Sequence, residues 1–317
     1  MMATLTLLTR ILFYGSFLLF VGIKAVEAYK NRGLFNGFEV TGSLIPTEQI
    51  HQGGPPRDGI PAIDEPEFVK ASEAENINPD SRILGLYLNN QARAYPISIL
   101  NWHEIVNDQF EQTNVTITYC PLCGTGMAFE SKDTEGFGVS GLLYNSDMLL
   151  YDRKTESLWS QIMKTAVSGP RKTEKLTALP LMHTDWQSWK IKHPDTLLLS
   201  RKTGFRRDYD KSPYIGYDTT ESLYFPVKHQ DTRYPKKESI IGLVLDGHQK
   251  VWPFSELKKA SVPLTDKIGP HNVTVHYNDE KDHAWVTDQQ GELLAAVRGY
   301  WFAWMAFHPD SQVFTSN

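Results

Sequence analysis

The chain has 317 residues and a net charge of −5 at pH 7, with 41% hydrophobic and 22% charged residues. These globular proportions exclude a disordered or collagen-like chain, and the lack of a basic excess argues against nucleic acid as a partner. The two cysteines, Cys120 and Cys123, are too few for a disulfide-dense scaffold or for a four-cysteine cluster within one chain.

The first 28 residues predict export. Residues 11–23 form an uncharged apolar run between Arg10 and Lys24, which fits the apolar region of a signal peptide and is short for a membrane-spanning helix. If Arg10 snorkels, residues 4–23 form an uncleaved membrane anchor instead. We therefore predict an extracytoplasmic protein, in the periplasm or at the cell surface, that is secreted or anchored to the membrane by residues 4–23.

Residues 29–62 are predicted to link this segment to the folded body. The stretches Gly53-Gly54-Pro55-Pro56 and Gly59-Ile60-Pro61 interrupt them, and no helical or strand period is visible. The compact body is expected from about residue 63.

Three sequence blocks of the body occur twice, in the same order. The matched blocks are residues 81–100 with 238–257, 114–119 with 272–277, and 186–196 with 301–311. This order predicts two diverged copies of one unit, residues 63–210 and 211–317, packed together as one body.

Each copy predicts a hairpin, a short helix, a strand and a second helix. In the first copy, residues 83–96 alternate around the turn pair Asn89-Asn90, which is typical of a hairpin. Residues 98–106 predict a helix capped by Ser98, and the β-branched residues 114–119 predict a strand. The fold class is therefore α+β with mostly antiparallel strands, and a helix near Trp186 completes the unit.

The two copies differ between the third strand and the last helix. Tyr119 and Trp189 are 70 positions apart, whereas Tyr277 and Trp304 are 27 positions apart. The first copy thus carries about 43 additional residues, which include both cysteines and are rich in strand patterns. Shared blocks indicate scaffold, so the additional residues are where chemistry is expected.

Cys120-Pro-Leu-Cys123-Gly follows the third predicted strand. Such a turn directs two sulfurs towards one point, and thiolates suit zinc or copper(I). Two thiolates are half of a tetrahedral site, so other side chains must complete it. The same spacing suits a redox dithiol or a short structural disulfide, and these interpretations stay open.

His103 is the strongest candidate for a third ligand. It lies with Glu104 on the short predicted helix, and the aligned positions of the second copy hold Ala260 and Ser261. The pair is therefore confined to the copy that carries the cysteines. The predicted metal ligands are Cys120, Cys123 and His103.

Asp147 is a candidate site residue because it interrupts an apolar stretch. Together with Cys120 and Cys123 it is a candidate catalytic group. We expect the additional residues to fold over the sulfurs and bring a polar side chain from residues 140–147 towards them. His193 and His308 occur in both copies and are predicted to be structural.

Several stretches together resemble a family of exported prokaryotic proteins named domain of unknown function 3179. These are residues 103–108, 119–124, 137–147, 151–161, 300–304 and 307–310. The resemblance covers roughly residues 60–317. It implies an exported or membrane-tethered protein, and it implies no established activity.

The predicted function is transition-metal binding, with copper or zinc at the Cys-x-x-Cys site. One alternative is a thiol–disulfide oxidoreductase that uses the same sulfurs. Another is a non-catalytic binding or scaffold module in which the sulfurs brace a loop. Whether the protein is an enzyme stays open, and the membrane is a partner if the N-terminal segment is not cleaved.

Overall fold

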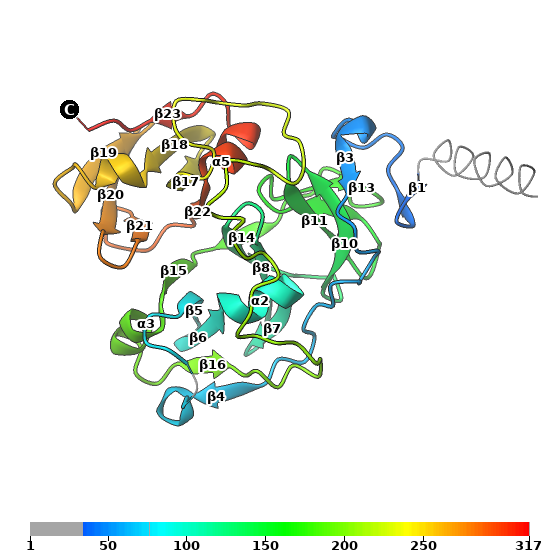
Figure 1. The fold of residues 1–317 in the computed structure, drawn as a ribbon, viewed down its shortest axis with the longest axis horizontal. Coiled ribbons are helices and arrows are strands. Elements are labelled where there is room, and N and C mark those ends of the chain that lie inside the picture. Colours follow the sequence, from blue (N-terminus) through cyan, green and yellow to red (C-terminus); the bar gives the residue numbers. More distant parts are fainter. Residues whose placement is uncertain (1–33, 76, 317) are drawn as a thin grey trace, which may run out of the picture.

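The computed structural model describes residues 34–75 and 77–316 (Figure 1). The segment predicted to be a signal peptide or membrane anchor, residues 1–28, lies outside these ranges. No helix among the described residues has both the length and the apolar character that a membrane crossing requires.

Strands dominate the fold. Among the described residues, 40% lie in strands and 11% in helices, and five sheets are arranged as the blades of a five-bladed β-propeller. A further ribbon pairs two short strands, β1 (Leu34–Phe35) and β2 (Phe38–Glu39). The prediction of an α+β fold made of two hairpin–helix–strand–helix units is therefore wrong.

Three of the five blades come from the part of the chain before residue 200. Sheet I has the order β15-β5-β6-β16-β4, with strands Met182–Asp185, Arg82–Leu88, Gln91–Pro96, Leu197–Leu199 and Phe68–Lys70. Sheet II has the order β14-β9-β8-β7, with strands Thr177–Leu179, Thr125–Glu130, Thr113–Cys120 and Ile105–Phe110. Sheet III has the order β13-β12-β11-β10-β3, with strands Thr165–Ser168, Leu158–Ser160, Asp147–Asp152, Phe137–Tyr144 and Ile50–Gln52.

The remaining two blades come from the C-terminal part. Sheet IV has the order β22-β17-β18-β23, with strands Val297–Tyr300, Ser239–Leu245, His248–Pro253 and Gln312–Val313. Sheet V has the order β19-β20-β21, with strands Leu264–Ile268, His271–Asn278 and His283–Thr287. Strand pairs are antiparallel except β6–β16 and β18–β23.

The fold class was mispredicted for two reasons. The short helices connect strands and form no layer. They are α2 (Ile97–His103), α3 (Trp186–Lys192), α4 (Phe254–Leu257) and α5 (Trp301–Phe307), with the 3₁₀ turns η1 (Thr47–Gln49) and η2 (Ala71–Glu73). The additional residues of the predicted first copy supply β10 to β13, which are most of sheet III. They build a separate blade and are not an insertion in a shared unit.

The helix predicted over residues 98–106 is shorter than expected. It begins at Ile97 without a side-chain cap, and it ends at His103 because Glu104 adopts a left-handed conformation with φ 58°. The chain then continues directly as β7. This backbone reversal separates His103 from Glu104, two neighbours that the sequence pattern treated as one pair.

Two hairpins use turn pairs that favour positive φ. Asn89 and Asn90 join β5 to β6 with φ of 50° and 59°, and Asp246 and Gly247 join β17 to β18 with φ of 48° and 82°. Turns with positive φ at both central positions match the twist of antiparallel strands. Both hairpins therefore follow from the local sequence.

Each of these hairpins packs a glycine under a tryptophan ring. A Cβ atom added at Gly85 would lie 2.5 Å from the ring of Trp189, and one added at Gly242 would lie 2.5 Å from the ring of Trp304. The indole nitrogens donate hydrogen bonds at 2.8 Å to Thr196 and at 2.9 Å to Ser311. The helices α3 and α5 are thereby fixed against sheets I and IV.

A buried aspartate ties the second strand of the β5–β6 hairpin to sheet II. Asp108 on β7 pairs with Arg93 and accepts a hydrogen bond from the hydroxyl of Tyr95. The side chain of Asp108 is 4% exposed and that of Arg93 is 13% exposed. Because both charges are largely removed from water, they depend on each other for compensation.

Sheets IV and V are joined by a corresponding contact. Asp266 on β19 accepts hydrogen bonds from Lys250 and from the indole of Trp252, each at 2.7 Å. Trp252 is fully buried. In both contacts, an aspartate of the neighbouring sheet thus pairs with a cationic side chain and accepts a hydrogen bond from an aromatic side chain of the hairpin.

Part of the predicted linker, residues 29–62, is packed against sheet III. From residue 34 onward it contains β1, β2, η1 and β3, and β3 pairs with β10. Phe38, Val40 and Ile50 are buried in the same cluster as residues of sheet III. Apolar side chains, spaced too irregularly to predict an element, account for this packing.

Residues 200–238 connect sheet I to sheet IV as a long irregular segment, hereafter the 200–238 segment. All of its residues are described, and none belongs to a helix or a strand. The amine of Lys237 donates hydrogen bonds to backbone oxygens of Tyr217, Thr220 and Ser222. These bonds close the middle of the segment into a compact loop, although it has no regular structure.

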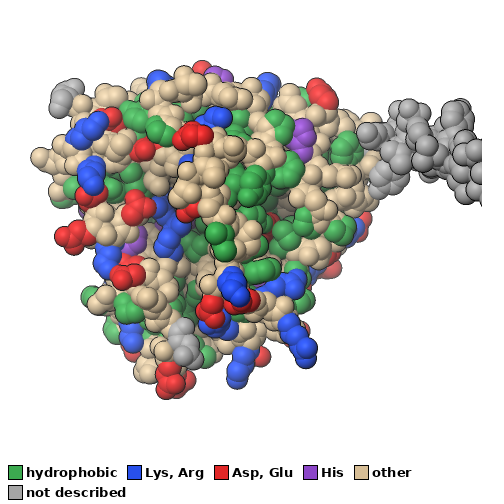
Figure 2. All heavy atoms as spheres, viewed as in Figure 1, with side chains coloured by type: hydrophobic (Ala, Val, Ile, Leu, Met, Phe, Trp, Pro, Cys, Tyr) green, Lys and Arg blue, Asp and Glu red, His purple; other side chains and the backbone are tan. Residues whose placement is uncertain are grey.

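Charges of both signs are interspersed on the face shown in Figure 2. Lysine and arginine side chains alternate with aspartate and glutamate side chains, in keeping with the small net charge of −5. No extended area of one sign covers this face.

The buried His283 and the half-buried His308 predict that the protein loses stability in mild acid. Burial lowers the pKa of His283 and of His308 from the ordinary value near 6.5 to about 4. Below pH 6.5 these histidines therefore bind protons in the unfolded chain but stay neutral in the folded chain. The free energy of unfolding falls between about pH 6.5 and pH 4 as a result. At about 1.4 kcal/mol per pKa unit, we expect a loss of roughly 2–3 kcal/mol per histidine across this window.

Urea unfolding at pH 7.5 and at pH 5 measures this effect. The variant His308→Gln should show a smaller difference between the two pH values than the wild type, because one proton-binding site of the unfolded chain is removed. The exposed His229 serves as the control, and His229→Gln should behave like the wild type. An equal free energy of unfolding at both pH values in the wild type would contradict the prediction.

Candidate metal centre

The two cysteines lie in the turn between β8 and β9 of sheet II. Cys120 is the last residue of β8, and the backbone N–H of Cys123 donates to its carbonyl at 3.2 Å. Gly124 has φ 66°, and a Cβ there would meet the ring of Tyr300 at 3.2 Å. The turn therefore requires glycine at this position, and it directs both sulfurs to the interior.

The β10–β11 hairpin of sheet III brings an aspartate to the sulfurs. Its turn residues Asn145 and Ser146 have φ of 51° and 64°, and Asp147 begins β11. One ligand atom each of Cys120, Cys123 and Asp147 lies within 4.8 Å of the others, and all three residues are buried. These three form a group of metal-ligating residues within the described part of the chain.

Both sulfurs are free thiols that share one acceptor. Cys123 donates to the carbonyl oxygen of Ser146 at 3.4 Å, and Cys120 donates to the same oxygen at 3.7 Å. Burial raises the pKa of Cys123 well above its ordinary value, and the neighbouring Cys120 raises it further. Without a cation, the thiolate form is therefore disfavoured.

Asp147 is only half satisfied by the protein. One carboxylate oxygen accepts the backbone N–H of Ile162 at 3.1 Å, whereas Oδ1 is buried without a hydrogen-bond partner among the described residues. Burial raises the pKa of Asp147 to about 8, although the backbone N–H groups of Ile162 and Met148 act in the opposite direction. A buried carboxylate with a free oxygen fits a role as a ligand, because an unpartnered polar atom otherwise costs free energy.

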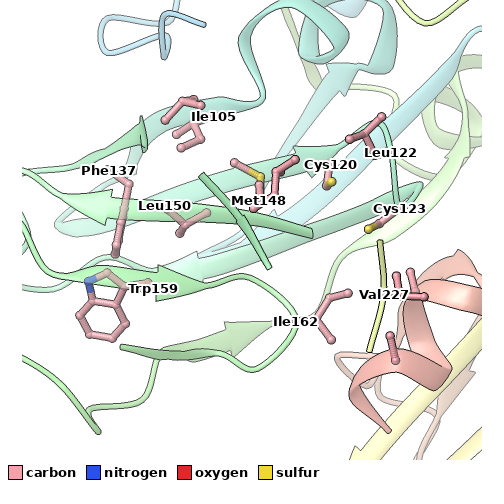
Figure 3. Packing of buried hydrophobic residues seen from close by; sticks show 14 of the residues in the cluster. Ile105, Cys120, Leu122, Cys123, Phe137, Met148, Leu150, Trp159, Ile162 and Val227 are labelled. Carbon is pink, nitrogen blue, oxygen red and sulfur yellow. The ribbon is translucent and has the colours of Figure 1, made fainter. Parts of the chain in front are cut away.

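The sulfurs lie at the edge of an apolar cluster between sheets II and III and helix α5. Leu122, Met148 and Val227 belong to this cluster, and Figure 3 shows the two sulfurs at one end and Trp159 at the other. The apolar surroundings exclude water from the sulfurs. Charge on the three polar side chains must therefore be compensated locally.

Two tyrosines and a glutamate surround the group. Burial raises the pKa of Glu104 to about 7, and the hydroxyl of Tyr214 donates to its Oε1 at 3.2 Å. The hydroxyl of Tyr217 is buried without a partner from the described ranges. Burial raises the pKa of Tyr217, and the neighbouring Cys123 and Cys120 raise it further; Tyr217 packs in the same cluster as both cysteines.

The 200–238 segment covers the group. Ser146 donates its hydroxyl to the carbonyl of Phe225 at 2.7 Å, and Lys228 donates its backbone N–H to Asn145 at 2.8 Å. Tyr217 and Val227 of the segment pack in the same cluster as the cysteines. The site is therefore a covered interior position.

The structure does not bring His103 to the sulfurs. Its Nδ1 contacts the carbonyl of Pro61 at 2.8 Å and its Nε2 contacts the hydroxyl of Tyr209 at 2.7 Å, so both ring nitrogens are engaged elsewhere. The left-handed residue Glu104 turns the chain between His103 and the site. His103 therefore does not join the two cysteines, and Asp147 takes the place that was predicted for it.

The other predicted histidines lie apart from the group. His193 packs on the ring of Trp189 with 4.2 Å between ring centroids, and His308 packs on Trp304 at 4.3 Å. Neither belongs to the set that contains the cysteines. Their contacts are those of structural side chains.

Sequence reasoning did not identify the tyrosines as site residues. Tyr214 and Tyr217 belong to a segment without any period, so no sequence signal connects them with the cysteines. Glu104 was noted only as the neighbour of His103, although its side chain is the one that accepts from Tyr214.

The comparisons with known proteins give a family and no activity. A family model with the description "Protein of unknown function (DUF3179)" matches residues 57–311. No curated protein and no solved structure matches the chain.

Proposed function

The chain belongs to the family described as protein of unknown function DUF3179, and this description names no activity. We therefore propose a function from the site itself. The protein binds a zinc ion through Cys120, Cys123 and Asp147. The observation that carries this proposal is the convergence of two sulfurs and one carboxylate oxygen within 4.8 Å in a buried position. Zinc accepts both thiolate and carboxylate ligands.

The donor set favours zinc over copper(I). Copper(I) prefers soft thiolate and thioether ligands, whereas a carboxylate is a hard ligand. Zinc binds cysteine sulfur at about 2.3 Å and carboxylate oxygen at about 2.0–2.2 Å, in tetrahedral geometry. A set of two sulfurs and one oxygen therefore suits zinc better, and copper(I) is the competing metal to test.

Three protein ligands leave one tetrahedral position for another group. Sites with three protein ligands and a water or substrate in the fourth position are typical of reactive zinc, whereas structural zinc is held by four protein ligands. Tyr217, whose hydroxyl has no partner among the described residues, packs in the same cluster as the two cysteines. It is suited to donate a hydrogen bond to a group in that position.

Thiol–disulfide exchange is the weaker proposal for the same sulfurs. The attacking group in such exchange is a thiolate, and reactive cysteines have a lowered pKa and partial exposure. Here burial raises the pKa of Cys123, and both cysteines are buried. A metal ion would instead provide the positive charge that the two thiolates require.

An extracytoplasmic location is part of the proposal. It is supported by the apolar run of residues 11–23, which fits a signal peptide or the core of an anchor formed by residues 4–23. The membrane is a partner if the segment is retained.

Metal analysis of the full chain, purified without added metal or chelator, tests the proposal. We expect one equivalent of zinc in the wild type and loss of this stoichiometric zinc in Cys120→Ser and in Asp147→Asn. His103→Asn is the matched control, because this buried side chain has its partners elsewhere and should retain the metal. Zinc retained at one equivalent in Asp147→Asn, or no bound metal in zinc-reconstituted wild type, would reject the assignment.

Competition with a chromophoric chelator gives the metal preference. Zinc should be held more tightly than copper(I) in the wild type. A Cys120→Ser variant that binds copper(I) as strongly as the wild type would show that the sulfurs do not define the site. Circular dichroism of each variant separates loss of metal from loss of fold.

A further inference from the structure

A groove of about 800 Å³ lies between sheets I and V. Residues of β5, β15 and helix α3 line one side, and residues of β20, β21 and the loop that follows β21 line the other. The two sheets also pack against each other through β15 and β21. Sites for small molecules have volumes of about 300–1,000 Å³, so the groove has the size of a ligand site. No proposed zinc ligand lines it.

The wall formed by sheet I is a row of three aromatic rings. Tyr87 on β5 is 53% exposed and stacks on His193, with 5.0 Å between ring centroids and 21° between ring planes. His193 in turn packs on Trp189 at 4.2 Å. The tryptophan–histidine pair recurs in sheet IV, where Val244 stands at the position that matches Tyr87. The hairpin and its helix are therefore built without this tyrosine in the second case.

The wall formed by sheet V carries a second aromatic stack. Trp285 on β21 and His276 on β20 are cross-strand partners, and their rings lie 4.9 Å apart with 2° between their planes. Nε2 of His276 also lies 3.2 Å from the hydroxyl of Thr287, which fixes the imidazole. Aromatic side chains thus line both sides of the groove, in orientations that their neighbours hold in place.

Polar side chains of both charge signs complete the lining. The amine of Lys192 lies 3.8 Å from Sδ of Met182, and no carboxylate pairs with this amine among the described residues. Asp288 uses one carboxylate oxygen to accept two backbone N–H groups. The exposed side chains of Gln289 and Glu292 make no hydrogen bond to another part of the described chain. Donors and acceptors are therefore free to meet a ligand.

We propose that this groove binds a neutral oligosaccharide. A sugar ring presents C–H groups on its faces and hydroxyl groups around its edge. The C–H groups carry partial positive charge and pack on the negative face of an aromatic ring, and the hydroxyls donate to carboxylates and accept from an ammonium group. The two aromatic walls and the free polar groups of the groove match these two properties.

The mixed charges of the lining favour a neutral ligand over a charged one. A small cation would be repelled by Lys192, and a small anion would be repelled by Asp288 and Glu292. A purely apolar ligand would remove these groups from water without giving them a partner, which costs free energy. A polyhydroxyl ligand can hydrogen-bond to all three side chains.

Calorimetric titration of the full chain with maltotriose, with cellotriose and with tri-N-acetylchitotriose tests the proposal. We expect saturable binding of at least one of these neutral trisaccharides. Tyr87→Ala should weaken it about tenfold, because one stacking surface is lost, and Lys192→Met should weaken it by removing a donor while keeping the apolar stem. The matched control is Tyr224→Ala, a change at another exposed tyrosine that does not line the groove, and it should bind like the wild type.

The outcomes separate the groove from other sites. Weaker binding in both groove variants, with unchanged affinity in Tyr224→Ala and in the zinc-ligand variant Asp147→Asn, supports the proposal, and circular dichroism verifies that each variant is folded. Wild-type affinity in Tyr87→Ala and in Lys192→Met would place the saccharide elsewhere and overturn the proposal. Titration with tetramethylammonium chloride probes a cationic ligand. Binding of this cation without binding of any trisaccharide, or no saturable binding of the three trisaccharides at all, would overturn it as well.

Discussion

Replacement of Asp108 by alanine is expected to lower the free energy of unfolding by roughly 3–5 kcal/mol, the cost of leaving one partner of a buried ion pair uncompensated. Arg93 and the hydroxyl of Tyr95 both depend on this carboxylate. Tyr95 is fully buried, so water cannot replace the lost acceptor. Urea unfolding at pH 7.5 measures the effect.

Asp266→Ala should show a similar loss, because Lys250 and Trp252 are left without their acceptor. Asp210→Ala is the matched control, since its ion pair with Arg201 is exposed on both sides and such pairs contribute about 0–1 kcal/mol. A loss below about 1 kcal/mol for Asp108→Ala would contradict the assigned role of the buried aspartate.

Replacement of Trp304 by alanine should cost roughly 3–5 kcal/mol, because a large buried ring is removed from between α5 and sheet IV. Gly242→Ala should cost about 1–3 kcal/mol by overpacking, since its Cβ would lie 2.5 Å from that same ring. The two effects are not independent. In the Trp304→Leu background, Gly242→Ala should be nearly neutral or stabilising, because alanine is favoured over glycine in a strand once the clash is gone.

The double-mutant cycle isolates this contact. The pair Gly85 and Trp189 in sheet I has the same geometry and should give a coupling of the same sign. Additive effects of Gly242→Ala and Trp304→Leu would show that the glycine is required for another reason. Urea midpoints at constant slope report the differences in stability.

Local features of the fold were accessible from the sequence, and its architecture was not. The turn pairs Asn89-Asn90 and Asp246-Gly247 identify their hairpins because few residues tolerate positive φ. Which strands become neighbours is decided by packing among sheets that are far apart in the chain. Strand β3 joins β10 across about ninety residues, and no local pattern encodes that pairing.

The family was recognised correctly from its motifs, and residues 57–311 match its model. The spacing of Cys120 and Cys123 predicted that their sulfurs lie close together, because a short turn at the end of a strand restricts the directions in which the two side chains can point. Asp147 could be noted because a carboxylate is out of place in an apolar stretch. Its position beside the sulfurs could not be predicted, because it depends on how sheet III packs against sheet II.

His103 was predicted as a ligand because it is confined to the copy that carries the cysteines, and the structure groups the cysteines with Asp147 instead. One left-handed residue, Glu104, reverses the chain after α2. The ring nitrogens of His103 contact Pro61 and Tyr209. No sequence pattern predicts either contact. Tyr217 packs in the cluster of the cysteines from an irregular segment, the middle of which is closed by the hydrogen bonds of Lys237.

Because the 200–238 segment covers the sulfurs, metal binding depends on when this segment docks. Cys123 has no exposed surface, so the zinc ion that we propose must arrive before the 200–238 segment docks, or enter when this segment detaches. Release is then governed by how often one loop detaches from Asn145 and Ser146, and such local openings have free energies of their own. Under the proposed zinc binding, the exchange rate is thereby set separately from the affinity, and a zinc-loaded protein would keep its ion long after the free zinc concentration has fallen.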